Sequence, residues 1–406
     1  MIVGVPTETA EDENRVAVIP SVAADLIDDG HEVIVAAGAG EASNWADTEY
    51  EAVGCEVLSD RKAVFERADV VFQVRGLGSA DVETDPYEEG QIAIGMYSPY
   101  EIADGTLEEL ADQNVSAFSL ELMPRISRAQ SMDALSSQSS LGGYKATLLA
   151  AEELPRMFPM EMTAAATIQP ADVFVIGAGV AGLKAIATAE RLGAATRAYD
   201  IRLEVKREVE SLGADFVELD LETEGSGDEE GYAQEMDEEF YAEQRKQMKR
   251  VVPESDVVIT TAAIPGAPAP ELVSTEMIER MDPGSVIVDL AAPTGGNCEP
   301  TVADETVHHE GVTIFGPTNL PSRVSHTASQ QYANNLRSFL ENLLDEDGNL
   351  DIDVEDEIID STLLVHAGAV RNPHVNDEDD TDTNDSEPDE TVDEDEDDYV
   401  EATDAE

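Results

Sequence analysis

A glycine-rich turn between an apolar strand and a helical segment places the strongest constraint on this chain. Residues 177–182 read Gly-Ala-Gly-Val-Ala-Gly, and the apolar run 173–176 directly precedes them. A segment with helical periodicity follows the turn, and a second β-rich run over 194–199 ends at Asp200. Strand, glycine turn, helix, strand and terminal acid, in this order, predict a βαβ unit of the Rossmann type.

Each part of this turn has a predicted role in holding a dinucleotide. Gly177 permits the tight turn, and Gly182 allows the helix to pack closely on the strand. Gly179, between Ala178 and Val180, lets a pyrophosphate approach the backbone N–H groups at the helix N-terminus. The alternative is a glycine turn that binds no ligand, but the surrounding strands and the terminal acid favour a nucleotide.

The acid at the end of the second strand indicates which dinucleotide is bound. Asp200 lies 23 residues after Gly177. Its carboxylate would accept hydrogen bonds from both hydroxyls of the adenosine ribose and would repel a 2′-phosphate. We therefore predict NAD(H) rather than NADP(H). We expect Arg202, two residues further on, to lie at the surface or to face the diphosphate.

Acidic residues dominate the composition: 89 Asp and Glu stand against 23 Lys and Arg, for a net charge of -66. Residues 377–406 hold 18 acids and no base, so the rest of the chain keeps 71 acids against 23 bases. Such a surface repels nucleic acid and anionic membranes. Its self-repulsion is screened in molar salt, where the Debye length is about 3 Å. This favours a halophilic protein, the alternative being an acidic surface for one basic partner.

The remaining composition indicates the compartment. Cys55 and Cys298 cannot form a disulfide framework and match no metal-ligand spacing, which favours a reducing compartment and no metal. The first residues lack the basic and apolar regions of a signal peptide. No apolar run reaches the length of about 18 residues that a membrane span needs. We expect a cytoplasmic protein without direct membrane insertion.

Short apolar runs alternate with helical patterns along the whole chain, which is typical of α/β proteins with parallel sheets. We expect strands at 2–5, 33–36, 69–74, 92–96, 116–122, 173–176, 196–199, 256–260, 285–290 and 312–315. We expect helices at 22–29, 62–68, 106–113, 133–156, 180–192 and 327–344. These elements predict two Rossmann-like domains with a cleft between them.

The predicted domains are discontinuous in sequence. Residues 1–132 together with 326–375 form the first Rossmann-like domain, and residues 133–325 form the NAD-binding domain. The acidic, Gly- and Ser-bearing segment 222–237 is expected to be a long mobile loop. Residues 376–406 are expected to be a disordered acidic tail, because their composition cannot bury a core.

Several sequence blocks resemble the NAD(H)-binding component of proton-translocating transhydrogenase. The most specific is 124–133, Pro-Arg-Ile-Ser-Arg-Ala-Gln-Ser-Met-Asp, continued by Ser-Ser-Gln-Ser at 136–139. Further blocks of the same resemblance lie at 5–8, 13–17, 231–233, 260–266, 295–298 and 318–324. The resemblance covers nearly everything before the acidic tail. It implies a two-domain fold and hydride transfer between NAD(H) on this chain and NADP(H) on a partner.

The resemblance implies roles for a polar loop over the nicotinamide. Gln130 would contact the dihydronicotinamide and help to bring the second ring near. Arg125 and Asp133 would position the carboxamide and the ribose, and these three residues are the catalytic candidates. The remaining candidates of this loop line the pocket or bind the carboxamide: Ile126, Ser127 and Ser136. The alternative is an ordinary Arg125–Asp133 ion pair at the start of a helix that Asp133 caps.

Five further NAD contacts are implied by the resemblance. Gly231 and Tyr232 belong to a loop that would close over NAD(H); the alternative is a disordered surface insertion. Ile201, Gln244 and Ala263 match other contact positions. Ala263 is smaller than the apolar residue expected there, which leaves its packing on the ring open.

Alanine dehydrogenases are the relatives of that family and share its Glu-x-Arg stretch at 13–15. Their amino-acid chemistry requires a lysine that grips the substrate and a histidine that serves as acid and base. Here Arg75 stands at the lysine position, and 95–99 read Gly-Met-Tyr-Ser-Pro without a histidine. The nucleotide is therefore expected to be the reactant itself, because hydride transfer between two nicotinamides needs no proton shuttle.

Three functions remain open from the sequence. The first is the NAD(H)-binding alpha subunit of a transhydrogenase, peripheral to the cytoplasmic membrane through its partners. The resemblance implies as partners a separate membrane subunit, an NADP(H)-binding beta-type subunit and a second copy of this chain in a homodimer. The second is an amino-acid dehydrogenase of the alanine type. The third is a non-catalytic NAD(H)-sensing module that acts through the acidic tail.

Overall fold

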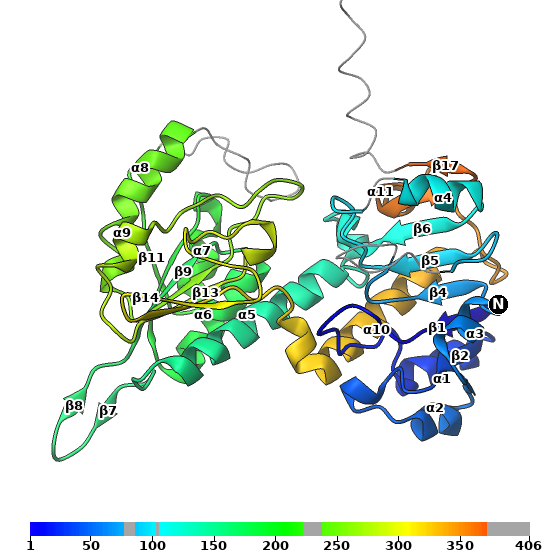
Figure 1. The fold of residues 1–406 in the computed structure, drawn as a ribbon, viewed down its shortest axis with the longest axis horizontal. Coiled ribbons are helices and arrows are strands. Elements are labelled where there is room, and N and C mark those ends of the chain that lie inside the picture. The colour runs from blue at the N-terminus through cyan, green and yellow to red at the C-terminus, as the bar shows by residue number, and fades with distance from the viewer. Residues whose placement is uncertain (77–85, 103–104, 222–237, 372–406) are drawn as a thin grey trace, which may run out of the picture.

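The computed structural model describes residues 1–76, 86–102, 105–221 and 238–371, which form two α/β domains (Figure 1). This confirms the predicted fold class. The predicted loop at 222–237 and the acidic tail at 376–406 lie outside the described residues. Within the described residues, no helix is both long enough and apolar enough to cross a bilayer.

The first domain is built on an eight-stranded sheet with strand order β17-β16-β6-β5-β4-β1-β2-β3. Its strands are β1 (Ile2–Val5), β2 (Glu32–Ala36), β3 (Glu56–Leu58), β4 (Val70–Phe72), β5 (Ile92–Gly95), β6 (Ser116–Ser119), β16 (Leu363–His366) and β17 (Ala369–Val370). The strands from β6 to β3 are parallel and follow the order 6-5-4-1-2-3 of a Rossmann sheet. The order reverses between β1 and β4, which is where such sheets hold polar sites.

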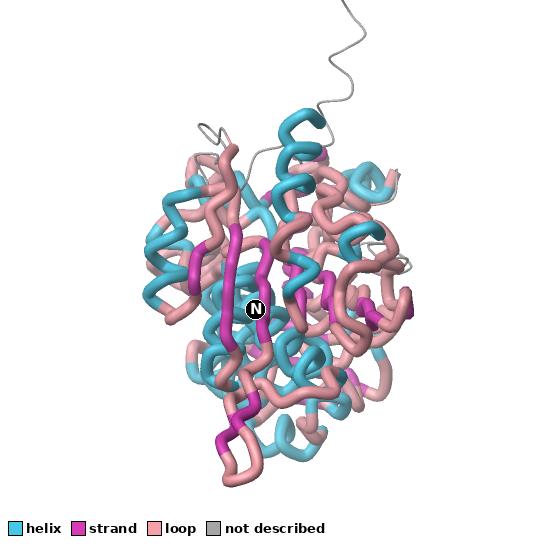
Figure 2. The backbone as a smooth tube through the Cα atoms, turned by 90° about the vertical axis from the view of Figure 1, so that its left-hand side faces the viewer, coloured by secondary structure: helices cyan, strands magenta, loops and turns pink. Residues whose placement is uncertain are grey.

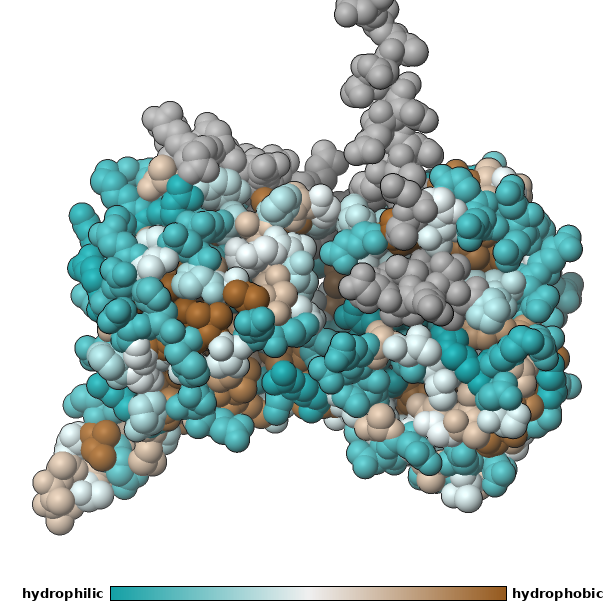
Figure 3. All heavy atoms as spheres, viewed as in Figure 1, coloured by the Kyte–Doolittle hydropathy of each residue, from teal (hydrophilic) through white to brown (hydrophobic). Residues whose placement is uncertain are grey.

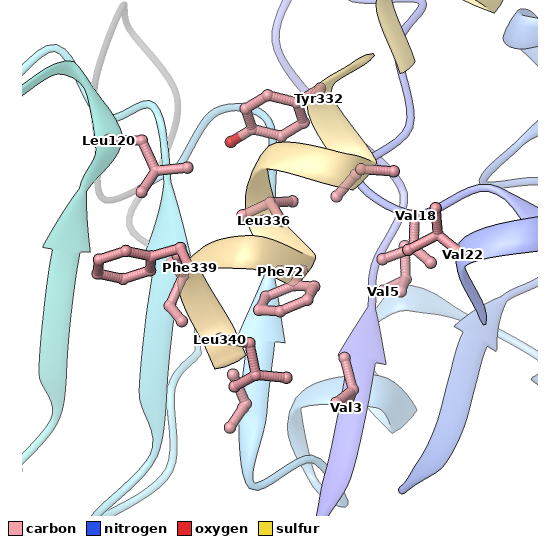
Figure 4. Packing of buried hydrophobic residues seen from close by; sticks show 14 of the residues in the cluster. Val3, Val5, Val18, Val22, Phe72, Leu120, Tyr332, Leu336, Phe339 and Leu340 are labelled. Atoms are coloured by element: carbon pink, nitrogen blue, oxygen red, sulfur yellow. The ribbon is translucent and has the colours of Figure 1, made fainter. Parts of the chain in front are cut away.

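Helices cover both faces of this sheet: α1 (Pro20–Asp28), α2 (Asp47–Val53), α3 (Arg61–Phe65), α4 (Thr106–Asp112), α10 (Ser325–Asn342) and α11 (Glu357–Thr362). On one face, Tyr332, Leu336 and Phe339 of α10 pack on β1 and β4 (Figure 4). On the other face, α3 and α4 contribute Phe65 and Leu110 to a second cluster. Burial on both faces explains why the central strands are apolar throughout.

The second domain repeats the same topology with the order β11-β10-β9-β12-β13-β15-β14. Its strands are β9 (Asp172–Ile176), β10 (Ala195–Tyr199), β11 (Asp215–Phe216), β12 (Val257–Thr260), β13 (Val286–Asp289), β14 (Thr306–His309) and β15 (Val312–Phe315). Its helices are α6 (Val180–Leu192), α7 (Lys206–Ser211), α8 (Glu238–Met248) and α9 (Thr275–Ile278). The strand order reverses between β9 and β12, beside the glycine turn that follows β9.

Helix α5 (Ala134–Glu153) belongs to both domains. Its first residue, Ala134, is buried in the core of the first domain, whereas Ala146 and Ala150 are buried in the core of the second. Asp133 caps the helix, as predicted, by accepting a hydrogen bond from the Ser136 N–H at 2.8 Å. The helix therefore fixes the polar loop at its N-terminus relative to the second domain.

Several elements differ from the sequence-based expectation. The sheets are mixed: β14 runs antiparallel to β15, and β16 runs antiparallel to both β6 and β17. Strand β14 lies at the edge of its sheet, and its residues alternate between exposed and half-buried. Its sequence therefore lacks an apolar run. The strand expected at 116–122 ends at Ser119, and Leu120–Leu122 form a 3₁₀ turn instead.

A short hairpin of β7 (Glu161–Met162) and β8 (Thr167–Ile168) was not expected either. It projects from the second domain, as Figures 1 and 2 both show. Its sequence is exposed and only weakly alternating, so it gives little signal of a strand.

Two neighbouring glycines in α5 provide a matched test of the contact between α5 and α6. A Cβ atom at Gly143 would lie 2.0 Å from the Ala181 carbonyl oxygen, whereas one at Gly142 would meet nothing within 4 Å. We expect Gly143→Ala to lower the free energy of unfolding by about 1–3 kcal/mol because it overpacks this contact. Gly142→Ala should raise it by roughly 0.5–1 kcal/mol because alanine favours helices. Urea denaturation in molar KCl, followed by circular dichroism, measures both; shifts of the same sign would contradict the assigned contact.

Candidate functional site

The fold itself requires two of the three glycines in the turn after β9. Gly177 has a φ of 93°, and a Cβ atom on it would lie 2.5 Å from Thr261 Oγ1. A Cβ atom on Gly182 would lie 1.8 Å from the Gly177 carbonyl oxygen. These two positions let the chain reverse and let α6 lie close to β9, with Ala178 buried between them.

The third glycine is not required by the fold. A Cβ atom on Gly179 would meet a single group of the described residues, Arg202 Nη2, at 4.0 Å, and its φ of -74° suits any residue. Gly179 directly precedes α6, which begins at Val180. Because glycine has no side chain, it cannot cap the first N–H groups of the helix. The space next to Gly179 is therefore open, at a helix N-terminus whose dipole favours an anion.

Asp200 lies at the end of β10 and is only 4% exposed. Its Oδ2 accepts hydrogen bonds from the Ala178 N–H at 2.6 Å and from Arg202 Nη2 at 2.9 Å. Its Oδ1 accepts from the backbone N–H of Arg202 at 2.8 Å and from Arg202 Nε at 2.9 Å. The Asp200 carboxylate thus connects the glycine turn to β10 through hydrogen bonds. The Arg202 side chain pairs with this carboxylate and lies beside Gly179. To accept hydrogen bonds from a ribose, Asp200 would have to release the Arg202 side chain. Ile201, which lies between Asp200 and Arg202 in the sequence, is half-buried.

The predicted nicotinamide loop alternates anchored and exposed side chains. Ala129 and Met132 are buried in the first-domain core, and Ile126 packs against the same cluster. Arg128 forms an ion pair with Asp356 at 2.8 Å. The side chains of three candidates on this loop are exposed: Arg125, Ser127 and Gln130. Contacts with the first-domain core therefore hold the loop in place, while Arg125, Ser127 and Gln130 face outward.

Helix α5 sets the distance between this loop and the glycine turn. Gly143 contacts the Ala181 carbonyl, just beyond Gly179 in the chain. Ser136 lies seven residues before Gly143, which corresponds to about 10 Å along a helix. The loop and the turn are thus separated by a span that one dinucleotide can bridge.

The other predicted contacts are distributed around the ends of β10 and β12. Gln244 of α8 is 3% exposed and donates from Nε2 to the Tyr199 hydroxyl at 3.0 Å. Burial raises the pKa of Tyr199, which keeps this hydroxyl neutral. Ala263 follows β12 and is exposed. Gly231 and Tyr232 lie outside the described residues.

A buried polar cluster in the first domain was not predicted. It lies at the carboxyl ends of β1 and β4, where the strand order reverses, and comprises Glu8, Glu13, Arg15, Gln73, Arg75 and Glu121. Arg15 donates to Glu13 from Nε at 2.7 Å and from Nη2 at 2.6 Å. The Glu-x-Arg spacing was the available signal, but the other members are far away in sequence.

Charge within this cluster is balanced internally. Burial opposes the ionisation of Glu13, but the Arg15 charge and hydrogen bonds outweigh it and hold the pKa of Glu13 below its usual value. Arg75 Nε lies 3.4 Å from the same carboxylate. Burial raises the pKa of Glu8 to about 8, although the Val74 and Arg75 N–H groups donate to it.

Each of the three guanidinium nitrogens of Arg15 donates at least one hydrogen bond within the protein. Besides Glu13, Arg15 donates from Nη1 to Gln138 Oε1 at 3.0 Å and from Nη2 to Asn319 Oδ1 at 3.4 Å. A small substrate carboxylate would have to displace these buried partners, at a cost of about 1–3 kcal/mol for each one left unpaired. The arrangement is therefore unsuited to gripping an amino acid or oxo acid.

Two family models match the chain. The model described as "Alanine dehydrogenase/PNT, N-terminal domain" matches residues 4–142, and the one described as "Alanine dehydrogenase/PNT, C-terminal domain" matches residues 146–373. Both domains of the structure thus have counterparts in one family.

Individual relatives fall into two groups. An NAD(P) transhydrogenase subunit alpha chain of Rhodospirillum rubrum is 43% identical over 92% of this chain and 98% of its own length. The crystal structure of transhydrogenase from Sinorhizobium meliloti superposes with a TM-score of 0.81 at 41% identity, covering 91% of this chain and 100% of that chain. Alanine dehydrogenase of Mycolicibacterium smegmatis is 29% identical over 85% of this chain and 88% of its own length. The chain is thus more similar to the transhydrogenase proteins.

Proposed function

The chain belongs to the alanine dehydrogenase/PNT family, and we propose that it is the NAD(H)-binding alpha subunit of an NAD(P) transhydrogenase. One observation carries this choice within the family. The glycine turn leaves open space at Gly179, whereas all three guanidinium nitrogens of Arg15 in the first domain already donate to protein partners. The site suits a dinucleotide that is itself the reactant, with no second small substrate.

Hydride transfer between two nicotinamides requires close approach and orientation of the rings. Gln130, exposed at the edge of the anchored loop, would contact the dihydronicotinamide. Arg125, Asp133 and Ser136 would orient its carboxamide and ribose, and Ile126 and Ser127 would line the pocket. The hydride leaves C4 of one ring for C4 of the other, so no residue of this chain has to take up a proton.

The second ring requires partner chains. The name "subunit alpha" of the relatives implies further subunits. We propose an NADP(H)-binding beta-type subunit and a separate membrane subunit that couples the reaction to proton translocation. This chain would then lie at the cytoplasmic face of the membrane through these partners.

The function is tested in molar KCl by following the reduction of an NAD analogue by NADPH. We expect turnover when this chain is mixed with the NADP(H)-binding partner, and none with alanine and NAD.

Gly179→Ala should weaken NADH binding about tenfold or more, roughly 1.4 kcal/mol, because its methyl group occupies the pyrophosphate position. Its melting temperature should match that of the unaltered chain, because the methyl group meets no other described protein atom within 4 Å except Arg202 Nη2. Oxidation of alanine by the unaltered chain would refute the proposal.

Asp200 and Arg202 should set the preference for NAD(H) together. Asp200→Asn should weaken NADH binding about tenfold, because a charged hydrogen-bond acceptor is lost from the ribose. It also removes the carboxylate that neutralises Arg202, so NADPH binding should strengthen through the 2′-phosphate. Arg202→Ala should discriminate against NADPH more strongly than the unaltered chain. Fluorescence titrations with both nucleotides measure these effects, and equal changes for NADH and NADPH in Asp200→Asn would contradict the assignment.

We further propose that the chain forms a homodimer through the hairpin β7–β8. The hairpin, which projects from the second domain (Figure 3), and the segment before it carry four exposed large apolar side chains. Met162 is 71% exposed and Ile168 49%, and Met157 and Met160 are each 50% exposed. Clustered exposed apolar residues of this kind commonly mark an interface.

Replacing these side chains should disrupt the dimer. We expect Met162→Ser combined with Ile168→Ser to shift the sedimentation coefficient in molar KCl from that of a dimer to that of a monomer. Val302→Ser serves as the control, because Val302 is also 45% exposed but lies outside the hairpin. A dimer that survives the double substitution, or dissociates with the control, would place the interface elsewhere.

A further inference from the structure

We propose that Asn335 of α10 is a positioning residue for hydride transfer, because it holds the backbone next to Gln130 at the end of a buried hydrogen-bond chain. The chain of bonds begins at the ion pair of Glu13 and Arg15. The inference rests on the proposed function, since it assigns a role relative to the nicotinamide loop. It concerns residues that neither the glycine turn nor the loop motif includes.

The first half of this series of hydrogen bonds connects the buried ion pair to helix α5. Arg15 Nη1 donates to Gln138 Oε1 at 3.0 Å, and both side chains are less than 5% exposed. Gln138 Nε2 then donates to the Ser137 hydroxyl at 3.2 Å and to the Ala328 carbonyl at 3.3 Å. Because Arg15 can only donate, the Gln138 amide has one possible orientation. The ion pair thereby fixes which way the Gln138 amide points.

The second half connects α5 to the loop through Asn335. The single proton of the Ser137 hydroxyl faces two acceptors, Asn335 Oδ1 at 2.8 Å and the Ala134 carbonyl oxygen at 3.0 Å, of which Asn335 is the nearer. Asn335 Nδ2 donates to the Ser131 carbonyl oxygen at 2.8 Å. A carbonyl oxygen can only accept, so the Asn335 amide is also fixed in one orientation. Asn335 is 7% exposed, so water has little access to replace either bond.

The carbonyl that Asn335 holds belongs to the residue directly after Gln130. Gln130 ends the 3₁₀ turn Ser127–Ala129 with an exposed side chain, and Ser131 joins it to the helix cap at Asp133. On the far side of Gln130, Arg128 is tied to Asn342 at 3.1 Å and to Asp356. On the side toward α5, Asn335 holds the backbone through a hydrogen bond, next to the buried side chain of Met132. Loss of this hydrogen bond would allow the Gln130 backbone to shift, and a misplacement of about 1 Å can slow a reaction by up to about a hundredfold.

The fold has other means of holding α10 in place. Tyr332, Leu336 and Phe339 are fully buried and pack against the first sheet (Figure 4). The Tyr332 hydroxyl also donates to the Gln73 carbonyl at 2.7 Å. Removing one amide at position 335 therefore leaves the attachment of the helix intact, and the role of Asn335 can be separated from folding.

The test compares Asn335→Ala with Asn334→Ala in the full chain. Asn334 is the exposed neighbour, and its side chain donates within its own helix, to the Gln330 carbonyl at 2.6 Å. We expect Asn335→Ala to slow single-turnover reduction of an NAD analogue by NADPH, with the NADP(H)-binding partner present, by about tenfold. The Kd for NADH should stay within twofold, because the glycine turn and Asp200 are unaltered. Asn334→Ala should match the unaltered chain in both.

Asn335→Asp provides a second variant of the same size. Its carboxylate cannot donate to the Ser131 carbonyl, but its protonated form can. We therefore expect its rate, relative to the unaltered chain at each pH, to recover as the pH is lowered. The inference is overturned if Asn335→Ala keeps its rate within twofold, if its rate and NADH affinity fall together, or if Asn335→Asp shows no such recovery. Absence of hydride transfer in the unaltered chain would instead refute the proposed function.

Discussion

Close contact between α5 and α6 determines how the two halves of this molecule can act on one ligand. Gly143 of α5 lies against the carbonyl of Ala181, which belongs to both the glycine turn and the first turn of α6, and the space between them admits no side chain. The same α5 begins in the first-domain core at Ala134 and is capped by Asp133. A single helix therefore sets the distance between the glycine turn, the proposed diphosphate site, and the polar loop, the proposed nicotinamide site. Precise spacing of this kind is what a reaction governed by ring approach requires.

The charges of the chain are used in two different ways. On the surface, acids exceed bases so strongly that one base can face several acids, as Arg337 faces Asp25, Asp29 and Glu341. Such exposed pairs contribute little and are screened in salt. In the interior, Glu13 and Arg15 pair with each other and with neutral amides, which favours the ionised form of both side chains. A buried pair of this kind is costly to break, and it is therefore a firm anchor for the hydrogen bonds that lead to Ser131.

The sequence predicted the fold class and the elements that carry a strong local pattern. The run at 173–176, the turn after it and the cap at Asp133 each depend on residues close together in the chain, and each was correctly placed. Edge strands such as β14 and β17 were missed, because a half-exposed edge strand has no distinctive pattern. The polar cluster was missed for a different reason. Arg15, Gln138 and Asn319 are brought together only by the tertiary fold, and the Glu-x-Arg spacing alone does not reveal their mutual hydrogen bonds.

The three glycines of the turn show how a motif can mix the needs of the fold with those of a ligand. Gly177 and Gly182 are explained without any nucleotide, because a side chain at either position would collide with Thr261 or with the Gly177 carbonyl. The fold places no such demand on Gly179, whose backbone is ordinary and whose Cβ position is open, so this glycine is free to serve the proposed diphosphate site. The first domain shows the opposite condition, with Arg15 closed off by its own partners. A chain that keeps a position free for a diphosphate, and closes the place where a small substrate would bind, is built to hold a nucleotide as its reactant.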